Sequence, residues 1–299
     1  MKAKTNDKIA TGIIYGVVGF IFLLLIFFIT YILYKGRDSL NLSFILGKNK
    51  TIEAGGGIGP QVFNSFYILV IALIITIPLG IGGGIYLSEY AGNGKILGFI
   101  RLCIETLASL PSIVVGLFGL LVFVTLLGWK YSILAGALSV SILSLPAMTR
   151  VSEMAISNAS KKVKEASLGL GATRWQTIVK LTLPSAMPEI LTGIILSGGR
   201  IFGEAAVFLY TAGMSAPLFE FSRVNLFSAT PAGKLSAFNL FRPAETLSVY
   251  IWKLNSEGMV QDASKIANGA SAILIIMILI FNFGARFLGN KLYKSYTGK

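Results

Sequence analysis

The chain has 299 residues, of which 54% are hydrophobic and only 13% are charged. A soluble protein of this composition would have too little polar surface to cover its core, so we expect a membrane protein. The sequence contains no His and only one cysteine, Cys103. This excludes an internal disulfide and argues against a metal site or a nucleophile–base pair. Lys and Arg outnumber Asp and Glu by 26 to 13, but they lie at the ends of apolar stretches, which argues against a nucleic-acid partner.

Six stretches are long and apolar enough to cross a bilayer as helices, which takes about 20 residues. They are Ile9–Tyr34, Val62–Ser88, Ile96–Leu127, Tyr131–Met148, Ala186–Ala212 and Gly269–Leu288. The first is too long to be a cleaved signal peptide. The sequence therefore predicts an all-α polytopic membrane protein with six transmembrane helices. We divide it into residues 1–61, a first helix with an outer loop, and residues 62–299, a core of five helices.

Two of these stretches carry residues that modify a simple helix. The second contains a glycine-rich run, Gly80–Gly84, which permits close contact with a neighbouring helix. The third contains Pro111, where we expect a break or kink. Arg101 and Glu105 lie one helical turn apart near the start of the third stretch, and we expect them to form a structural pair.

The distribution of Lys and Arg predicts the orientation in the membrane. If the N-terminus is cytoplasmic, the inner connections carry more basic residues than the outer ones. An even number of spans then places both termini in the cytoplasm. Two longer connections, Lys35–Gln61 and the outer loop 213–268, lie outside. Within the second, Glu245–Lys253 is expected to form an interfacial or re-entrant helix.

The inner connection after the fourth span is polar and basic. We call Lys161–Pro184 the basic segment; it forms most of the wider loop 150–184. Gly169 and Gly171 should end a first short helix, and Ala172–Leu183 should form a second, which Pro184 closes or kinks. Such a segment can bind a partner groove as an amphipathic helix, or it can lie on anionic lipid.

The fifth span contains two ionisable residues, Arg200 and Glu204. A charge at bilayer depth costs about 2.5 kcal/mol or more, so these residues should face the protein interior. Their spacing of four allows them to pair on one helix face. Arg200 could offer a planar set of N–H donors to an oxyanion in transit, and the negative charge of Glu204 would keep Arg200 from binding the anion too firmly to release it. The alternative is a structural salt bridge. Arg150, at the inner end of the fourth span, is a candidate for gating or inner-surface contact.

The basic segment resembles the EAA loop of ABC-importer permeases. In that family Glu-Ala-Ala, a spaced Gly and a final Leu-Pro mark the cytoplasmic helix that docks on an ATPase. The pattern is matched by Glu165, Ala166, Gly171, Leu181, Leu183 and Pro184. Ser167 replaces the second Ala, and Leu181 replaces Ile. The resemblance implies a type I ABC-importer permease fold.

Three further stretches resemble the PstA-type permease subunits of bacterial phosphate importers. They are Glu105–Gly119, Ser144–Arg150 and Gly199–Gly213. The similarity extends from about residue 62 to the end. Ala205 and Val207 depart from the Thr and Pro usual in that family.

This resemblance implies a subunit of the bacterial cytoplasmic (inner) membrane that carries inorganic phosphate and is not itself an enzyme. Its expected partners are a PstC-type permease paralogue, an ATPase dimer and an extracytoplasmic phosphate-binding protein. The chain has no Gly-x-x-x-x-Gly-Lys-Ser/Thr phosphate loop. We expect it to bind no cofactor, with ATP and Mg used by the ATPase.

Other functions stay open at this point. The cargo could be sulfate, molybdate or phosphonate. A secondary anion transporter or channel would work without an ATPase, and usually shows an internal inverted repeat, which this sequence lacks. A membrane protein that reports phosphate supply to a sensor kinase is a third possibility.

Overall fold

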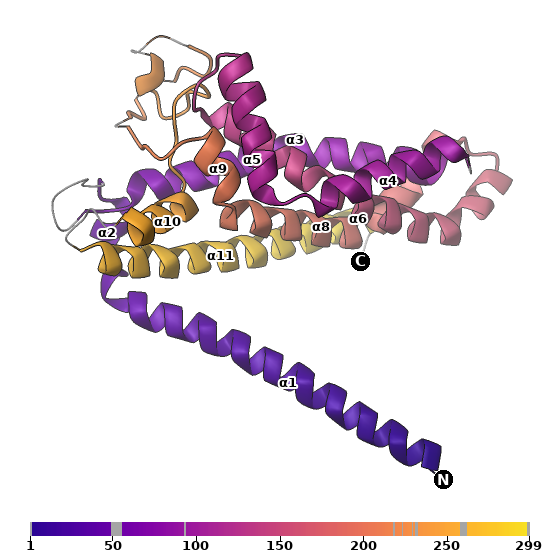
Figure 1. Cartoon of the computed structure of the whole chain (residues 1–299). Coiled ribbons are helices and arrows are strands. Elements are labelled where there is room, and N and C mark those ends of the chain that lie inside the picture. The colour runs from indigo at the N-terminus through magenta and orange to yellow at the C-terminus, as the bar shows by residue number, and fades with distance from the viewer. Residues whose placement is uncertain are drawn as a thin grey trace.

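The chain is helical over most of its length in a computed structural model (Figure 1). The structure describes residues 2–48, 56–92, 94–217, 219–222, 224–228, 230, 233–257 and 262–297. Within these residues, five helices are long and apolar enough to cross a membrane, and a bent helix pair passes the same test when its two parts are taken together, which gives up to six spans. The predicted all-α architecture with six membrane spans is therefore confirmed.

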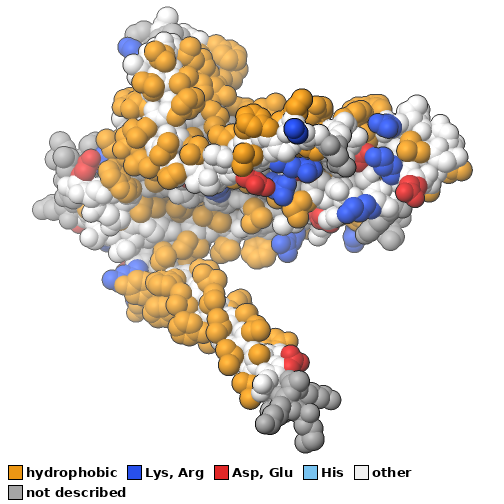
Figure 2. Space-filling model, turned by 45° about the vertical axis from the view of Figure 1, so that its right-hand side comes forward, with side chains coloured by type: hydrophobic (Ala, Val, Ile, Leu, Met, Phe, Trp, Pro, Cys, Tyr) orange, Lys and Arg blue, Asp and Glu red, His pale blue; other side chains and the backbone are white. Residues whose placement is uncertain are grey.

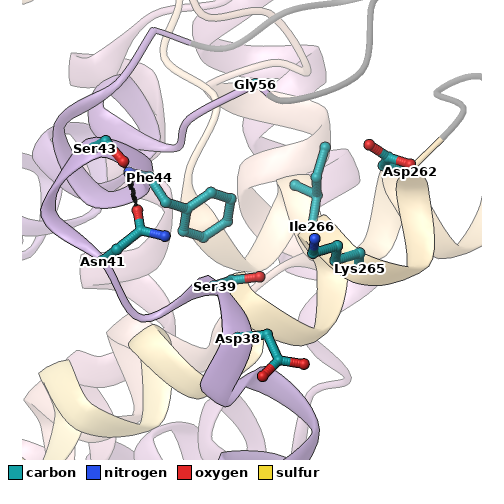
Figure 3. A pocket seen from close by; sticks show the side chains of 9 residues that line it. All are labelled: Asp38, Ser39, Asn41, Ser43, Phe44, Gly56, Asp262, Lys265 and Ile266. Atoms are coloured by element: carbon teal, nitrogen blue, oxygen red, sulfur yellow. Dashed lines mark hydrogen bonds between the residues drawn. The ribbon is translucent and has the colours of Figure 1, made fainter.

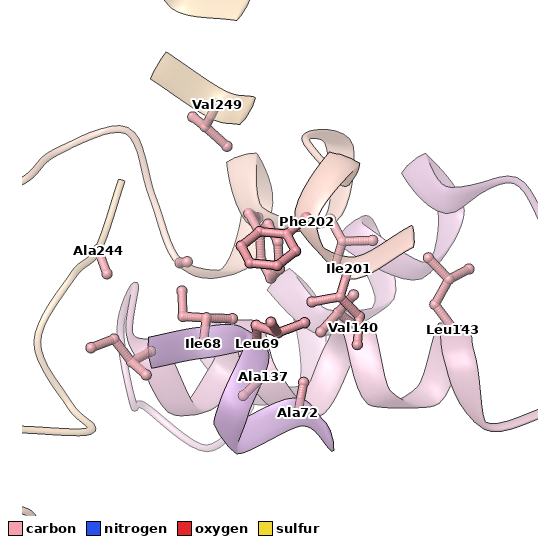
Figure 4. Close-up of a cluster of buried hydrophobic side chains, with 14 of the residues drawn as sticks. Ile68, Leu69, Ala72, Ala137, Val140, Leu143, Ile201, Phe202, Ala244 and Val249 are labelled. Carbon is pink, nitrogen blue, oxygen red and sulfur yellow. The ribbon is translucent and has the colours of Figure 1, made fainter. Parts of the chain in front are cut away.

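Four helices form the body of the molecule and lie side by side (Figure 1). They are α3 (Gly59–Ile85), α6 (Ile133–Gly169), α8 (Leu183–Gly203) and α11 (Ala263–Thr297). Their inward faces share one apolar core, in which Leu69 of α3, Val140 of α6 and Phe202 of α8 are buried (Figure 4). Burial of this surface in a protein interior, rather than against lipid, fixes how the helices are arranged.

Helices α3 and α6 pack closely, and glycine makes this contact possible. A Cβ atom at Gly80 would lie 2.5 Å from Cγ of Met148, and one at Gly84 would lie 2.5 Å from Cβ of Ser152. Real side chains do not approach so closely, so the two backbones can touch only because these positions lack a side chain. The expected role of Gly80–Gly84 in close helix contact is confirmed.

Helix α6 is much longer than the predicted fourth span, which ended at Met148. It continues for 21 residues to Gly169 because the residues that follow are mostly good helix formers. Its buried face also continues, through Ser152, Ile156 and Ser160. The first half of the basic segment is thus the end of α6 rather than a separate short helix.

The predicted break at Pro111 is confirmed. Helices α4 (Lys95–Ser109) and α5 (Ser112–Gly119) meet at an angle of 97°, and the π-helical stretch η3 (Leu120–Leu126) prolongs α5. Leu110 adopts an extended conformation, which the ring of the following proline favours. The pair therefore turns sharply where a single straight span would continue.

The predicted fifth span, Ala186–Ala212, is also interrupted. Helix α8 ends at Gly203, Glu204 is extended with φ −71° and ψ 123°, and the short α9 (Ala206–Thr211) follows. Glu204 therefore lies at a break between two helices and not inside one.

Residues 213–257, which we call the cap segment, fold over one end of the bundle (Figure 1). The cap segment contains the short η5 (Gly233–Leu235) and α10 (Leu247–Glu257), which is the helix expected near Glu245–Lys253. Residues 218, 223, 229, 231, 232 and 258–261 of the predicted outer loop lie outside the described residues, as do residues 49–55 of the first one. The basic segment lies at the other end of the bundle.

Helix α1 (Lys2–Gly36) diverges from the bundle, and its last residues meet the bundle near the start of α11, where Gly36 packs against Asn268 and Ala272 (Figure 1). The most apolar window of α1 has no buried residue. After η1 (Arg37–Ser39) the chain forms α2 (Leu42–Leu46), whose first residues are capped by the side chain of Asn41.

A pocket of 250 Å³ lies here, between η1, α2 and the start of α11 (Figure 3). It is lined by Asp38, Ser39, Asn41, Ser43, Phe44, Gly56, Asp262, Lys265 and Ile266. Asn41 is engaged locally, because its Oδ1 accepts hydrogen bonds from the Ser43 hydroxyl and the Phe44 N–H. The pocket lies at the end of the bundle opposite the basic segment.

Candidate translocation and coupling sites

The first part of the basic segment presents its EAA-type residues on the last turns of α6. Glu165 and Ala166 are exposed, whereas Ser167 is buried. The Ser167 hydroxyl lies 2.8 Å from the hydroxyl of Thr177, which belongs to the next helix. This buried bond ties the two halves of the segment together, so Glu165 and Ala166 sit on a firmly held surface.

A tight turn joins these halves. Gly171 has φ +85°, a conformation that side chains disfavour. Helix α7 (Arg174–Thr177) then begins with a capping box, in which Thr173 and Gln176 satisfy each other's backbone N–H groups. The sequence signal at Gly171 thus marks the end of α6, as the glycine chemistry requires.

Pro184 does not close the helix predicted for Ala172–Leu183, because the helical residues run on without a gap from Arg174 to Gly203. The π-helical η4 (Ile178–Thr182) follows α7 directly, and α8 begins at Leu183. Pro184 occupies the first turn of α8, where the missing N–H costs little. The wider π-helical turns before it make room for the proline ring.

The tip of the basic segment exposes two large apolar side chains. Leu170 is 90% exposed and Trp175 is 60% exposed. Glu165 and Arg174 of the same segment are exposed as well, and such a mixed surface can fit a groove on a protein partner.

An ion pair anchors the basic segment to α3. Lys164 Nζ lies 2.7 Å from Glu89 Oε2, and the Glu89 side chain is only 3% exposed. Glu89 belongs to the π-helical η2 (Tyr86–Tyr90) at the end of α3. A polar pocket of 250 Å³ beside the pair is lined by Ser88, Glu89, Ser157, Ser160, Lys161, Lys164 and Glu165. Movement of the segment would therefore act on α3 as well as α6.

Arg200 lies on an open face of α8. Its side chain is exposed, and a Cβ at Gly199 or Gly203 would meet no atom within 4 Å. Gly198 faces the other way, against the ring of Phe281. The guanidinium thus projects from the single chain on a face lined by glycine.

The predicted pairing of Arg200 with Glu204 inside one helix is wrong, because the helix ends between them at Gly203. Glu204 Oε1 instead accepts a hydrogen bond from the N–H of Val207 at 3.3 Å, at the start of α9. The Glu204 carbonyl accepts a hydrogen bond of 2.6 Å from Ser248 of α10. The break that carries Glu204 is therefore held by the cap segment.

Arg150 joins a group of four charged side chains between α4 and α6. The expected pairing of Arg101 with Glu105 is wrong: Arg101 binds Glu153 at 2.6 Å, and Glu105 lies 3.8 Å from Arg150. Arg150 also reaches Glu153 at 3.3 Å. Pairing across two helices is possible because α4 packs along α6. Figure 2 shows basic and acidic side chains together below a largely hydrophobic area.

Sequence reasoning missed a buried polar network at the cap end. Arg242 and Glu245 are fully buried. Asn64 of α3 bridges them: its Oδ1 accepts from Arg242 Nη2 at 2.7 Å, and its Nδ2 donates to the Glu245 carbonyl at 3.0 Å. The Arg242 guanidinium also stacks over the ring of Phe219 at 4.4 Å. The signal available in the sequence was Arg-Pro-Ala-Glu between apolar residues, which we interpreted only as loop charge.

Burial shifts the titration of this network. It lowers the pKa of Arg242 to about 10 and raises the pKa of Glu245. Hydrogen bonds from Gln61 and Lys253 to the Glu245 carboxylate, at 2.8 and 3.1 Å, oppose the second shift. Burial, with a smaller contribution from Glu245, raises the pKa of Tyr250 to about 12. The network holds the cap segment on α3.

No cluster of three or more His, Cys, Asp or Glu residues suited to a metal ion occurs in the described part of the chain. The sites above are instead built from Arg, Lys and carboxylate side chains. They can bind and exchange anions or dock a protein partner.

Comparison with known proteins identifies relatives along nearly the whole chain. Residues 76–297 match the model of a family described as "Binding-protein-dependent transport system inner membrane component". A Bacillus subtilis protein named "Probable ABC transporter permease protein YqgI" is 52% identical over 297 residues, which cover 99% of each chain. The Xylella fastidiosa "Phosphate transport system permease protein PstA" is 29% identical over 254 residues, covering 85% of this chain and 82% of its own.

A solved structure supports the fold. A chain of the MetNI methionine ABC transporter in an inward-facing conformation aligns with a TM-score of 0.54 at 17% identity. The alignment covers 80% of this chain and 94% of that one. The arrangement of helices is thus that of an ABC-importer permease.

Proposed function

The chain belongs to the family of binding-protein-dependent transport system inner membrane components, and we propose that it is the PstA-type permease subunit of an ATP-driven phosphate importer. Membership makes it a multi-pass inner-membrane permease component of an ABC importer. The finer assignment, to inorganic phosphate, draws on the resemblance to PstA-type proteins and on the placement of Arg200.

The exposed guanidinium of Arg200 is the observation that carries the proposal. An always-charged side chain on a membrane span would cost about 2.5 kcal/mol or more if it faced lipid. The face around it, formed by Gly199 and Gly203, leaves room for a passing ion or for a neighbouring subunit. Once a second permease covers this face, Arg200 lines a pathway and offers paired N–H donors to phosphate oxygens.

Glu204 acts as the counter-charge of this pathway. It lies at the break between α8 and α9, four residues beyond Arg200, and its conformation is fixed by Ser248. A carboxylate near Arg200 weakens the hold of the guanidinium on a dianion, so that the ion can leave. Arg150 contributes a further cation on the same path.

The basic segment docks on an ATPase dimer. Glu165, Ala166 and Gly171 form the contact surface, the buried Ser167 holds it in place, and Leu183 and Pro184 carry its movement into α8. Both termini lie on the same side as the ATPase, which uses ATP and Mg, while this chain binds no cofactor and catalyses no reaction. A PstC-type paralogue completes the pore, and an extracytoplasmic phosphate-binding protein delivers the ion.

Uptake of labelled phosphate tests the cargo. Vesicles would contain this chain, the paralogue, the ATPase and the binding protein, with Arg200→Gln beside the wild type. Arg286→Gln, an exposed arginine on α11, is the matched control. We expect Arg200→Gln to lose uptake while assembly and ATP hydrolysis persist, and Arg286→Gln to transport normally.

Normal uptake by Arg200→Gln would contradict the pathway role. Transport of sulfate, molybdate or phosphonate in place of phosphate would keep the permease and overturn the cargo. Transport driven by an ion gradient with this chain alone would overturn the dependence on ATP.

Charge reversal at Glu165 tests the docking surface. Glu165 is exposed, so Glu165→Lys should insert and assemble with the paralogue, but ATP hydrolysis should no longer drive uptake. Exposed Glu189 of α8 provides the control Glu189→Lys. Unaltered coupling in Glu165→Lys would contradict the docking claim.

A further inference from the structure

Four charged side chains meet between α4 and α6, and their bonds are unequal. Arg101 donates two hydrogen bonds to one oxygen of Glu153, at 2.6 and 3.0 Å. Arg150 donates one to the other oxygen of Glu153, at 3.3 Å. Glu105 approaches Arg150 only to 3.8 Å, beyond hydrogen-bond distance. Glu153 is thus the fixed acid of the group, and Glu105 is loosely held.

Exposure separates the two acids in the same way. The side chain of Glu153 is 8% exposed, whereas that of Glu105 is 61% exposed. An exposed ion pair at this separation is weak, because water screens it. If Glu105 moves away, the group keeps two arginines and one carboxylate, and therefore one uncompensated positive charge. Arg150, 46% exposed, would then have most of its N–H donors available.

The surroundings require this charge to face water or protein. Neighbouring positions of α4 expose Phe99 and Leu102 to the outside of the single chain. Half-exposed ions among such side chains would be costly against lipid. The group therefore lies on a face that another subunit covers or that borders an aqueous path.

The group lies nearer to the basic segment than Arg200 does. Gly193 of α8 packs against Val151, next to Arg150 on α6. Arg200 is seven residues further along α8 towards the cap segment, which corresponds to roughly 10 Å of helix rise. An anion that passes Arg200 on its way towards the ATPase side would next reach Arg150.

Building on the proposed function, we propose that Arg150 and its neighbours form a second oxyanion site, in which Glu105 and the transported ion alternate on Arg150. Arg150 offers the paired donors that suit two oxygens of a tetrahedral anion such as phosphate. Glu105 is the releasable competitor, since its contact is the weakest in the group.

The position of Glu105 on α4 provides the means of exchange. A small rotation of α4 away from α6 breaks the contact between Glu105 and Arg150. The pair between Arg101 and Glu153, one helical turn along both helices, is short and doubly bonded, so it keeps the helices together. Return of α4 brings the Glu105 carboxylate back to Arg150 and expels the anion.

The test compares Glu105→Gln with wild type in vesicles that contain the complete importer, with labelled phosphate as the probe. Glu189→Gln makes the same chemical change at an exposed acid elsewhere, and Glu105→Asp keeps the charge. We expect Glu105→Gln to lower the maximal uptake rate by about two- to fivefold, the loss expected for a weak exposed pair. The phosphate concentration at half-maximal uptake, set at the binding protein, should not change.

Slow release has a second signature. Phosphate trapped inside the vesicles should inhibit uptake by Glu105→Gln at about two- to fivefold lower concentration than in wild type, because the anion no longer competes with the weak, exposed pair between Glu105 and Arg150. Glu105→Asp should restore both values towards wild type.

Three outcomes would overturn the second site: Glu105→Gln behaves as Glu189→Gln does, Glu105→Asp behaves as Glu105→Gln does, or internal phosphate inhibits all variants equally. These results leave the proposed cargo intact, provided that wild type takes up phosphate. Absence of phosphate uptake by wild type overturns the cargo and the site together.

Discussion

Removal of Asn64 should loosen the cap segment. This side chain is fully buried and bridges Arg242 and the carbonyl of Glu245, at 2.7 and 3.0 Å. Asn64→Ala leaves a charged N–H and a carbonyl without these partners in a buried place. A hydrogen bond to a charged group contributes about 1.5–3 kcal/mol, and an unpaired buried carbonyl costs about 1–3 kcal/mol. We therefore expect a loss of about 3–4 kcal/mol in the free energy of unfolding.

Thermal unfolding of the purified chain in detergent, followed by circular dichroism, measures the effect. For a chain of 299 residues, with an unfolding entropy of about 2.1 cal/mol/K per residue, the loss corresponds to a fall in Tm of roughly 5–6 °C. Asn255→Ala is the matched control, since Asn255 is exposed and donates a hydrogen bond to the Ile251 carbonyl of its own helix. Asn64→Asp keeps the acceptor for Arg242 and should recover part of the stability. If Asn64→Ala and Asn255→Ala unfold at the same Tm, the network does not hold the cap segment.

Two further predictions concern packing and pH. Gly84→Ala should lower the free energy of unfolding by about 1–3 kcal/mol, because the new methyl group would overlap Ser152. Gly82→Ala has open space around it and should be close to neutral. Equal Tm values for the two variants would refute the close contact of α3 and α6. Burial raises the pKa of Glu245, so the folded chain holds this proton more firmly than the unfolded chain does. The resulting stability is present below the unfolded pKa and is lost as pH rises through the raised, folded value. Over the same pH range, Tm should therefore fall more for wild type than for Glu245→Gln. The other titratable groups that face this position, Lys253, Tyr250 and Glu257, are the same in both proteins. Parallel curves of Tm against pH would contradict the prediction.

The sequence was sufficient for the helical class, the span count and the break at Pro111. Each of these depends on local chemistry: apolar length, or the geometry that a proline ring imposes on the residue before it. The end of α6 at Gly169 and the turn at Gly171 follow from glycine in the same local way, although we predicted a short separate helix there. The missed continuity arose because polarity after Met148 suggested a loop, whereas an amphipathic helix satisfies the same pattern.

Charge pairing was not predictable from spacing. The sequence placed Arg101 with Glu105 and Arg200 with Glu204, each four residues apart. In the structure Arg101 pairs across to Glu153, and the helix ends before Glu204. Spacing rules describe neighbours on one helix, but partners on another helix depend on packing that no local pattern encodes. The burial of Arg242 by Phe219 and Asn64 escaped prediction for the same reason.

The length of α6 has a mechanical consequence. Its 37 residues extend roughly 55 Å, well beyond the ~30 Å hydrocarbon layer, so one helix runs from the membrane to the basic segment. Glu153 forms an ion pair with Arg101 of α4 at an intermediate point of α6, and the helix can pivot about this point. Glu165 lies 12 residues, or roughly 18 Å, further on, so a swing of about 10° moves it by roughly 3 Å. The displacement of Glu165 that a given rotation of α6 produces is thus set by its distance from Glu153. Inserting one turn of helix between Glu153 and Glu165 would change this distance and therefore the displacement.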